Sequence, residues 1–196
     1  MTLVFLGSGD FGKELFNFNK QFKIEEKILL LSIKNFKSKK FLNFKNSKKK
    51  IKYFITIGNP NLRSLIYNKI TKNKKLINTK IIFKNVTIGK KTKIDAGTVV
   101  MSNVVISSNV SIGKNCHIHP NVVIGHDVKI GKNVTISANV FIGGNSKIDD
   151  NCVINPNSTI IKNIKISKNC SVGSGSVVIY NLKHNTHVFG VPAKIL

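Results

Sequence analysis

Between residues 112 and 148 the chain reads IGKNCHIHPNVVIGHDVKIGKNVTISANVFIGGNSKI, and an isoleucine recurs there every six residues. The same period extends from Ile82 to Val172, so that sixteen consecutive hexads begin with Ile or Val and no insertion interrupts them. A helix repeats every 3.6 residues and a strand every two, so neither produces this pattern alone. The period predicts short strands separated by tight corners, with three hexads closing one triangular coil.

The fourth position of each hexad is the expected corner. Asn occupies twelve of the sixteen fourth positions, glycine takes two more (Gly97 and Gly175), and Lys91 and Asp127 fill the rest. Asn and Gly tolerate the left-handed backbone region better than other residues, and a sharp corner requires that region. Residues 79–196 are therefore predicted to form a left-handed parallel β-helix.

All three cysteines, Cys116, Cys152 and Cys170, fall on the fifth position, which is otherwise small or β-branched. A large residue at the first position and a small one at the fifth describe the filled interior of a flat-sided coil. We therefore expect packed core thiols, and three cysteines are too few for a disulfide framework.

Residues 1–78 precede the hexads and are predicted to form a small α/β Rossmann-like module. The expected elements are a strand, a glycine turn, a helix, two more strands and a second helix, at residues 2–6, 7–12, 14–22, 27–33, 53–59 and 60–69. A strand, glycine turn and helix in succession can hold a phosphate on backbone N–H groups. The module is too short for a full dinucleotide fold, which favours a mononucleotide or a nucleotide sugar over NAD. The lysine-rich stretch 36–52 carries no motif.

The composition limits the possible function classes. The net charge is +24 and the hydrophobic fraction 41%, so the chain is globular and not disordered. No apolar run approaches the length of a membrane span, and the first residues lack a basic leader, so we expect a cytoplasmic protein without membrane partners. Of the 32 basic residues only Arg63 is an arginine. Sites that read nucleic acid usually recruit arginine, so we expect no nucleic-acid partner but a surface that attracts anionic ligands.

The sequence IGHD at 124–127 is the candidate for chemistry. Asp127 is the acidic corner residue, and His126 stands beside it. In coils of eighteen residues Ser108 lies beneath His126 and Gly144 above it, which leaves room for a ligand over the ring. The alternative interpretation is a solvated corner histidine and a turn glycine; the acid and the glycine in register favour a functional site.

The other histidines give weaker indications of a functional site. His119, seven residues before His126, is a candidate to line the same groove, whereas His117, His184 and His187 have no such stacking relation. Zinc needs ligands converging at about 2 Å, and three histidines of one short segment without a ligand from a distant coil do not predict a metal site.

Several motifs together resemble the hexapeptide-repeat sugar acetyltransferases of bacteria, the group of sialic-acid O-acetyltransferases and UDP-4-amino-sugar N-acetyltransferases. The residues that carry the resemblance are the glycine turn 7–12, FITIGN at 54–59 with Leu62-Arg63, the hexads, IGHD at 124–127, and GVPAK at 190–194. The resemblance implies an acetyl-CoA-dependent enzyme without a metal. It also implies a homotrimer that binds acetyl-CoA between neighbouring β-helices.

The resemblance also implies residue roles. His126 would be the general base that deprotonates an amine or hydroxyl, Asp127 would raise its basicity and orient it, and the Gly144 N–H would stabilise the oxyanion. The implied acetyl-CoA contacts are Thr135, Gly144, Pro156, Lys162 and Ser174. The implied substrate contacts are Gly9, Asp10, Phe11, Ser32, Ile33, Gly58 and His119.

Three departures from the family pattern affect these implications, and one of them is the lysine-rich insert 36–52. Ser32 and Ile33 replace an acidic pair of nucleotide-sugar members, and Thr135 replaces a second histidine at the thioester, where a weaker contact is expected.

N-acetylation of a UDP-linked amino sugar for a surface glycan is the first hypothesis. O-acetylation of sialic acid or a related sugar is the alternative, and a catalytically silent β-helix scaffold is the alternative outside enzymes.

Overall fold

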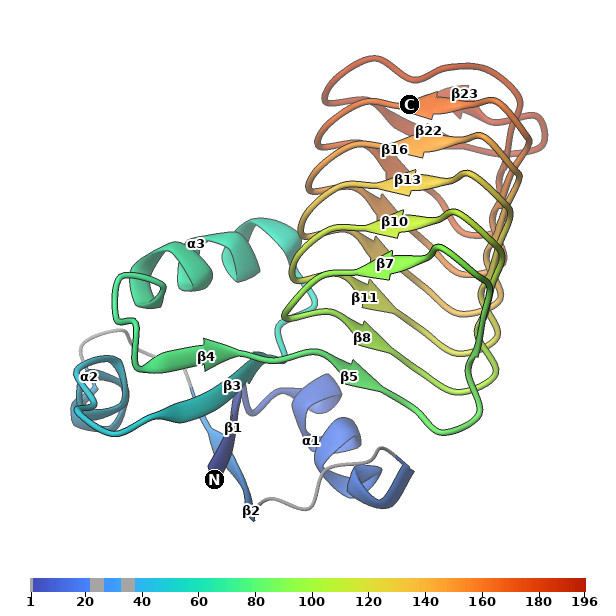
Figure 1. Ribbon diagram of the computed structural model, residues 1–196. Helices are drawn as coiled ribbons and strands as arrows, with labels where there is room; N and C mark the ends of the chain where they lie inside the picture. The colour runs from blue at the N-terminus through green and yellow to red at the C-terminus, as the bar shows by residue number, and fades with distance from the viewer. Residues whose placement is uncertain (1, 22–26, 33–37) are drawn as a thin grey trace.

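A computed structural model describes residues 2–21, 27–32 and 38–196. The chain first forms a small sheet with helices, called here the α/β part, and then a stack of triangular coils that rises beside it to the C-terminus (Figure 1).

The α/β part is built on a parallel four-stranded sheet in the order β2-β1-β3-β4. Its strands are β1 (Thr2–Leu6), β2 (Lys27–Leu31), β3 (Ile51–Ile55) and β4 (Leu76–Asn78). Its helices are α1 (Asp10–Asn17), the 3-10 turn η1 (Asn19–Gln21), α2 (Lys39–Lys45) and α3 (Pro60–Ile70). Successive residues of β1 point to opposite faces, so Leu3 and Phe5 pack with α1 and the β-helix, whereas Val4 and Leu6 pack with α2 and α3.

The structure contains the helices and strands predicted for this part, but the bounds of several of them differ from the prediction. The first strand, 2–6, and the start of the second long helix at Pro60 are confirmed. Helix α1 begins at Asp10, four residues before its predicted start, because Gly9 caps it in an extended conformation. Strand β3 begins two residues earlier than predicted and ends at Ile55.

Helix α2 lies in the lysine-rich stretch in which no motif was found. Its two phenylalanines, Phe41 and Phe44, are buried against Tyr53, and the Ser38 side chain caps the helix by accepting a hydrogen bond from the Phe41 N–H at 3.3 Å. The signal was a capping serine followed by two aromatic residues three apart, which place both rings on one face.

The coils form a parallel β-helix with three flat faces. The packed face, whose first four strands contact the α/β part, consists of β5 (Ile81–Ile82), β8 (Val99–Val100), β11 (His117–Ile118), β14 (Thr135–Ile136), β17 (Val153–Ile154), β20 (Ser171–Val172), β22 (His187–Phe189) and β23 (Lys194–Ile195). The apolar face consists of β6 (Thr87–Ile88), β9 (Val105–Ile106), β12 (Val123–Ile124), β15 (Phe141–Ile142), β18 (Thr159–Ile160) and β21 (Val177–Val178). The lysine face consists of β7 (Lys93–Ile94), β10 (Ser111–Ile112), β13 (Lys129–Ile130), β16 (Lys147–Ile148) and β19 (Lys165–Ile166).

The strand pairing confirms the predicted eighteen-residue coil: Ile118 pairs with Ile136, and Ile124 with Ile142. The first-position side chains fill the core from Val100 onward. Ile88, in the first coil, is instead 41% exposed, because the described part of the chain places no coil beneath it. The three cysteines are free and buried, as predicted.

The predicted corners are also confirmed. Fifteen of the sixteen fourth positions, Lys91 and Asp127 among them, have φ between 57° and 75°; the exception among the described residues is Asn85. At one edge the asparagine side chains hydrogen-bond from coil to coil, starting with Asn85 Nδ2 to Asn103 Oδ1 at 2.6 Å. Asparagine therefore supplies the corner conformation and a bond between coils.

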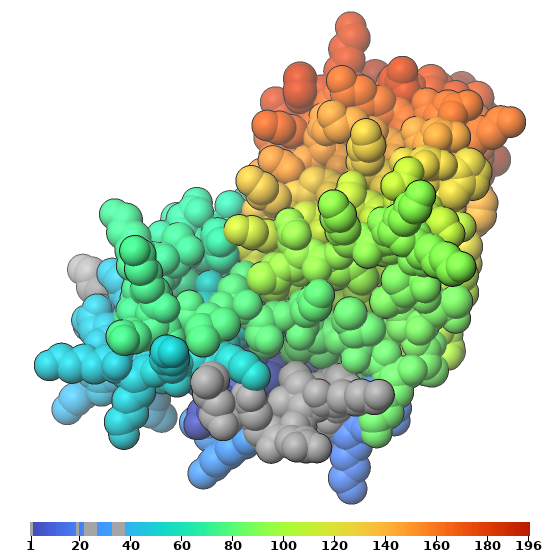
Figure 2. All heavy atoms as spheres, in the orientation of Figure 1, coloured from blue at the N-terminus to red at the C-terminus, as the bar shows by residue number. Residues whose placement is uncertain are grey.

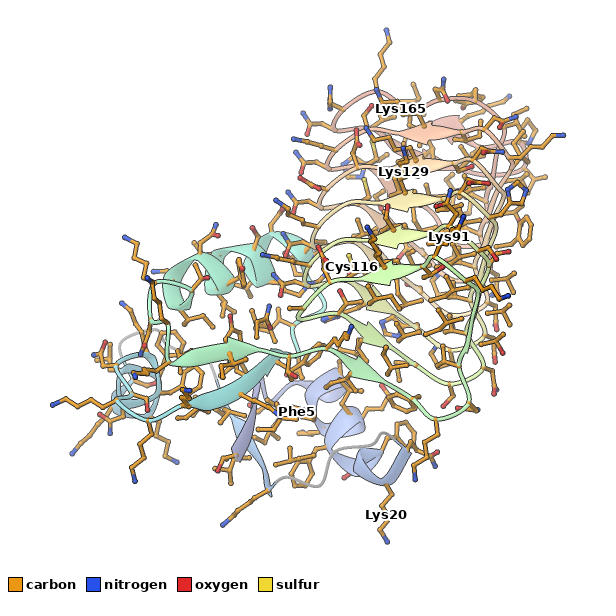
Figure 3. All side chains as sticks on the ribbon, viewed as in Figure 1. Phe5, Lys20, Lys91, Cys116, Lys129 and Lys165 are labelled. Atoms are coloured by element: carbon orange, nitrogen blue, oxygen red, sulfur yellow. The ribbon has the colours of Figure 1, made fainter. Side chains whose placement is uncertain are left out.

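The outward side chains give each face its character. On the packed face His117 and Thr135 are buried under the α/β part, whereas on the apolar face Phe141 is 45% exposed. The lysine face presents lysines such as Lys129 and Lys165 to solvent (Figure 3). In the described part of the chain, no helix has the length and apolar character needed to cross a membrane.

Candidate active site

His126 and Asp127 lie at the corner between the apolar and lysine faces, directly after β12 (Val123–Ile124). His126 Nδ1 is 2.7 Å from Asp127 Oδ2, and the two side chains are 62% and 41% exposed. The other oxygen of Asp127 accepts a short hydrogen bond from Asn109 Nδ2. The hydrogen bond from His126 and then that from Asn109 lower the pKa of Asp127, so its carboxylate stays ionised and holds the imidazole.

The imidazole of His126 lies against Gly144 of the next coil. A Cβ at Gly144 would stand 2.8 Å from His126 Nε2, so only glycine leaves the ring in this position. The predicted stacking of Gly144 on His126 is therefore confirmed. Among the described residues Nε2 and the Gly144 N–H have no protein hydrogen-bond partner, while the Gly144 carbonyl accepts from the Asn163 N–H at 3.0 Å.

Replacing Gly144 by alanine is expected to displace the His126 ring and lower the turnover number, kcat, at least tenfold. The Cβ contact with Nε2 at 2.8 Å is the reason, and an ångström-scale misplacement of a catalytic group has an effect of about this size or larger. Steady-state kinetics and the melting temperature, Tm, test the prediction. Ser108→Ala, one coil beneath the ring, is the matched control, and wild-type kcat in Gly144→Ala would contradict the prediction.

The expected acetyl-CoA contacts fall on two edges of the β-helix. Lys162 is exposed one coil above Gly144, on the same edge as His126. Pro156 and Ser174 are exposed one coil apart on the edge between the packed and apolar faces. Within one chain the width of the apolar face therefore separates these two groups.

Thr135 lies elsewhere. Its side chain is buried on the packed face, where Oγ1 accepts from Arg63 Nη2 at 3.0 Å and donates to the Gly58 carbonyl at 3.2 Å. The expected contact of Thr135 with the thioester beside His126 does not agree with this position, because the hydroxyl is covered by the α/β part and already hydrogen-bonded.

A pocket of about 530 Å³ opens at the carboxyl ends of the strands of the α/β part. Its lining residues are Gly7, Ser8, Gly9, Asp10, Phe11, Ser32, Thr56, Ile57 and Gly58. Ligands of open parallel sheets bind at this end of the strands. The structure therefore brings together the predicted substrate residues Gly9, Asp10, Phe11, Ser32 and Gly58, and Ile33 lies outside the described residues.

The Gly7 turn is fixed by close backbone contacts. Gly7 has φ +129°, and its carbonyl accepts a hydrogen bond from Thr56 Oγ1 at 2.7 Å. A Cβ at Gly12, inside α1, would stand 2.1 Å from the same carbonyl oxygen. These glycines let α1 approach the strand ends, as in nucleotide-binding turns.

His119 lies against Phe11 and not at the His126 corner, contrary to the prediction that both histidines line one groove. Its ring centroid is 5.2 Å from that of Phe11, a pocket residue, and Phe11 also contacts His117 at 4.8 Å. Seven residues carry the chain across the apolar face, so His119 and His126 occupy different edges of the coil.

The two inner histidines are neutral. Burial, followed by the charge of Arg63, lowers the pKa of His119 to about 4 and that of His117 well below its ordinary value. His117 Nε2 lies 3.0 Å from the Ile55 carbonyl, which can only accept, so Nε2 carries the proton.

Acidification from pH 6.5 to 5 is therefore expected to destabilise the fold. The unfolded chain binds protons at these histidines below about pH 6.5, whereas folded His119 binds its proton only near pH 4. The free energy of unfolding should thus fall by about 1–2 kcal/mol over this interval because of His119, and the lowered pKa of His117 acts in the same direction. Urea unfolding at both pH values measures it. His119→Gln should remove part of this dependence, and His184→Gln, at an exposed position, is the control. The same loss of stability in wild type and His119→Gln would contradict the prediction.

Arg63 is the residue that sequence reasoning missed. It is fully buried between α3 and the packed face, and the signal was its standing as the sole arginine among 32 basic residues.

Within the described ranges, no group of three or more His, Cys, Asp or Glu side chains is arranged to hold a metal ion.

Comparisons with known proteins define the class of this fold. The family model described as bacterial transferase hexapeptide (six repeats) matches residues 109–144, the segment that contains His126. No curated protein matches the sequence of this chain.

Solved structures match over the whole chain. PerB from Caulobacter crescentus, in complex with CoA and GDP-perosamine, has a TM-score of 0.89 at 19% identity, covering 100% of this chain and 97% of that one. The acetyltransferase domain of PglB from Neisseria gonorrhoeae has a TM-score of 0.78 at 19% identity, covering 100% and 99%. The same domain in complex with acetyl coenzyme A has a TM-score of 0.66 at 18% identity, covering 100% and 98%. At these identities the similarity shows that the chain shares their fold.

Proposed function

We propose that the protein is an acetyl-CoA-dependent N-acetyltransferase that modifies the amino group of a nucleotide-linked sugar used for surface glycans. The observation that carries the proposal is the His126–Asp127 pair held under Gly144 at an exposed corner of a hexapeptide β-helix. A pocket of about 530 Å³ on the α/β part is of a size suited to a nucleotide sugar. The similarity to structures that contain CoA and GDP-perosamine, or acetyl coenzyme A, supports both ligands.

We assign the two ligands to two domains. Residues 1–78 would be a Rossmann-like module for the nucleotide sugar, and residues 79–196 the β-helix acetyltransferase domain with its C-terminal tail. The position of the pocket at the strand ends of the sheet and the start of the first coil at Ile81, directly after β4 ends at Asn78, support this division.

The geometry suggests the sequence of proton transfers. The nitrogen of the sugar amine attacks the thioester carbonyl and forms the C–N bond, while His126 Nε2 takes a proton from that nitrogen. The Gly144 N–H donates to the oxyanion of the tetrahedral intermediate. When the C–S bond breaks, His126 returns the proton to the leaving sulfur. Asp127, ionised throughout, holds Nδ1–H and stabilises the imidazolium.

A homotrimer would complete the site. The apolar face is exposed in one chain, with Val105, Val123 and Phe141 at 38–45% exposure. Packing of this face against a second copy would bring the Pro156 and Ser174 edge of one chain to the His126 and Lys162 edge of its neighbour. Acetyl-CoA would then lie between the chains. Because both ligands are metabolites of the cytoplasm, we place the reaction there.

Thiol release from acetyl-CoA tests the proposal directly. The acceptors are UDP- and GDP-linked 4-amino sugars and, in parallel, free sialic acid. Turnover with an amino sugar supports N-acetylation, and turnover with sialic acid alone would replace it by O-acetylation. Binding of acetyl-CoA without turnover on any acceptor would reject these acceptors. Failure to bind acetyl-CoA would reject the enzyme and favour the silent scaffold.

A further inference from the structure

Arg63 carries a buried charge at the seam between the α/β part and the β-helix, which lie side by side (Figure 2). Its side chain is 0% exposed, and each group to which it donates is neutral. A buried charge without a carboxylate partner is unfavourable compared with an apolar side chain of similar volume. Its presence therefore points to a role other than stability.

All five N–H groups of the guanidinium have an acceptor, and the acceptors lie on two structures. Nη1 donates to the carbonyls of Ile57 at 2.7 Å and Gly58 at 2.9 Å, both in the loop after β3. On the β-helix side Nε donates to the Asn115 carbonyl at 2.8 Å, and Nη2 donates to the Asn133 carbonyl at 2.8 Å and to Thr135 Oγ1. The planar fork of arginine thus joins the loop to two successive coils in a way that lysine cannot reproduce.

The loop held by Arg63, called here the floor, contributes to the lining of the pocket. Thr56, Ile57 and Gly58 line it, and a Cβ at Gly58 would meet no atom within 4 Å. The β-helix makes further bonds to this segment, from Thr135 Oγ1 to the Gly58 carbonyl and from His117 Nε2 to the Ile55 carbonyl. The coils therefore fix the position of the loop, in addition to the sheet that carries it.

We propose that Arg63 is a positioning residue for the acceptor substrate, because it sets the Ile57–Gly58 floor of the pocket at a fixed place on the coils of the β-helix. This inference rests on the proposed function, since it assumes that the nucleotide sugar occupies that pocket. Arg63 acts through the loop and touches neither the acetyl donor nor His126.

The test compares Arg63→Lys and Arg63→Met with wild type in steady-state kinetics on a nucleotide-linked 4-amino sugar. Arg63→Met should raise the KM for the sugar at least tenfold and leave the KM for acetyl-CoA within twofold. Arg63→Lys, which keeps the charge and loses the fork, should raise the sugar KM about threefold to fivefold. Ile66→Val, also buried on α3 but packed in the α/β core, is the control for stability.

Each outcome is decisive. Unchanged sugar KM in folded Arg63→Met, or equal changes for both substrates, would overturn the proposal, as would a sugar KM raised equally in Ile66→Val. If Arg63→Met does not fold, Arg63→Lys and Thr135→Val carry the test, and both should raise the sugar KM selectively.

A wild-type protein without turnover would instead reject the proposed acceptor. In that case amide hydrogen exchange tests the effect of Arg63 on the loop without a turnover assay. Faster exchange confined to residues 56–58 in Arg63→Lys supports the positioning role, and unchanged exchange overturns it.

Discussion

His126→Ala is expected to lower kcat for the acceptor by about 10²–10⁴-fold, the range that a positioned general base supplies. The ring is 62% exposed and contributes no core packing, so the oligomer and the Tm should remain those of wild type. The KM for acetyl-CoA should change little, because the base acts on the acceptor. Thiol release at saturating acetyl-CoA measures the effect.

Two further variants show whether the loss arises from a base. Asp127→Asn keeps the shape of the corner but removes the charge that orients Nδ1–H, so a smaller loss than in His126→Ala is expected. His184→Ala removes another exposed histidine and should behave as wild type. If His126→Ala retains wild-type turnover, the corner histidine is a solvated residue and the scaffold interpretation gains support.

The β-helix could be predicted from sequence because its determinants are local. Each hexad contains its own inward isoleucine and its own corner residue, and the fixed spacing places Gly144 over His126 without any tertiary knowledge. The single acidic corner at Asp127 marked the site for the same reason. The first coil departs from the pattern, since burial of Ile88 would need a coil beneath it, and the described residues form none there.

The seam between the two parts could not be predicted because it depends on how they dock. Arg63 finds acceptors 52 and 70 residues away, at Asn115 and Asn133, and no local pattern encodes such contacts. Thr135 was assigned from the family resemblance and His119 from its spacing to His126, but the α/β part covers the face or edge on which they lie. Spacing within a coil fixes the register of a residue, whereas docking decides what covers it.

Charging the apolar face is expected to dissociate the proposed trimer. Phe141→Lys combined with Val123→Lys places two adjacent charges on paired strands, at side chains that are 45% and 38% exposed in one chain. Burying unpaired charges in an interface is unfavourable by several kcal/mol each. Because both side chains point outward, the folded monomer should survive with little change in its circular dichroism.

Sedimentation at micromolar concentration and thiol release measure the two consequences together. Wild type should sediment as a trimer, and the double variant as a monomer whose turnover is at least a hundredfold lower, because a single chain holds the expected acetyl-CoA contacts on two separate edges. Lys129→Gln and Lys147→Gln together, on the matched strand positions of the lysine face, should keep the trimer and its activity. A wild-type monomer would refute the trimer, and an active monomeric variant would show that one chain contains the whole site.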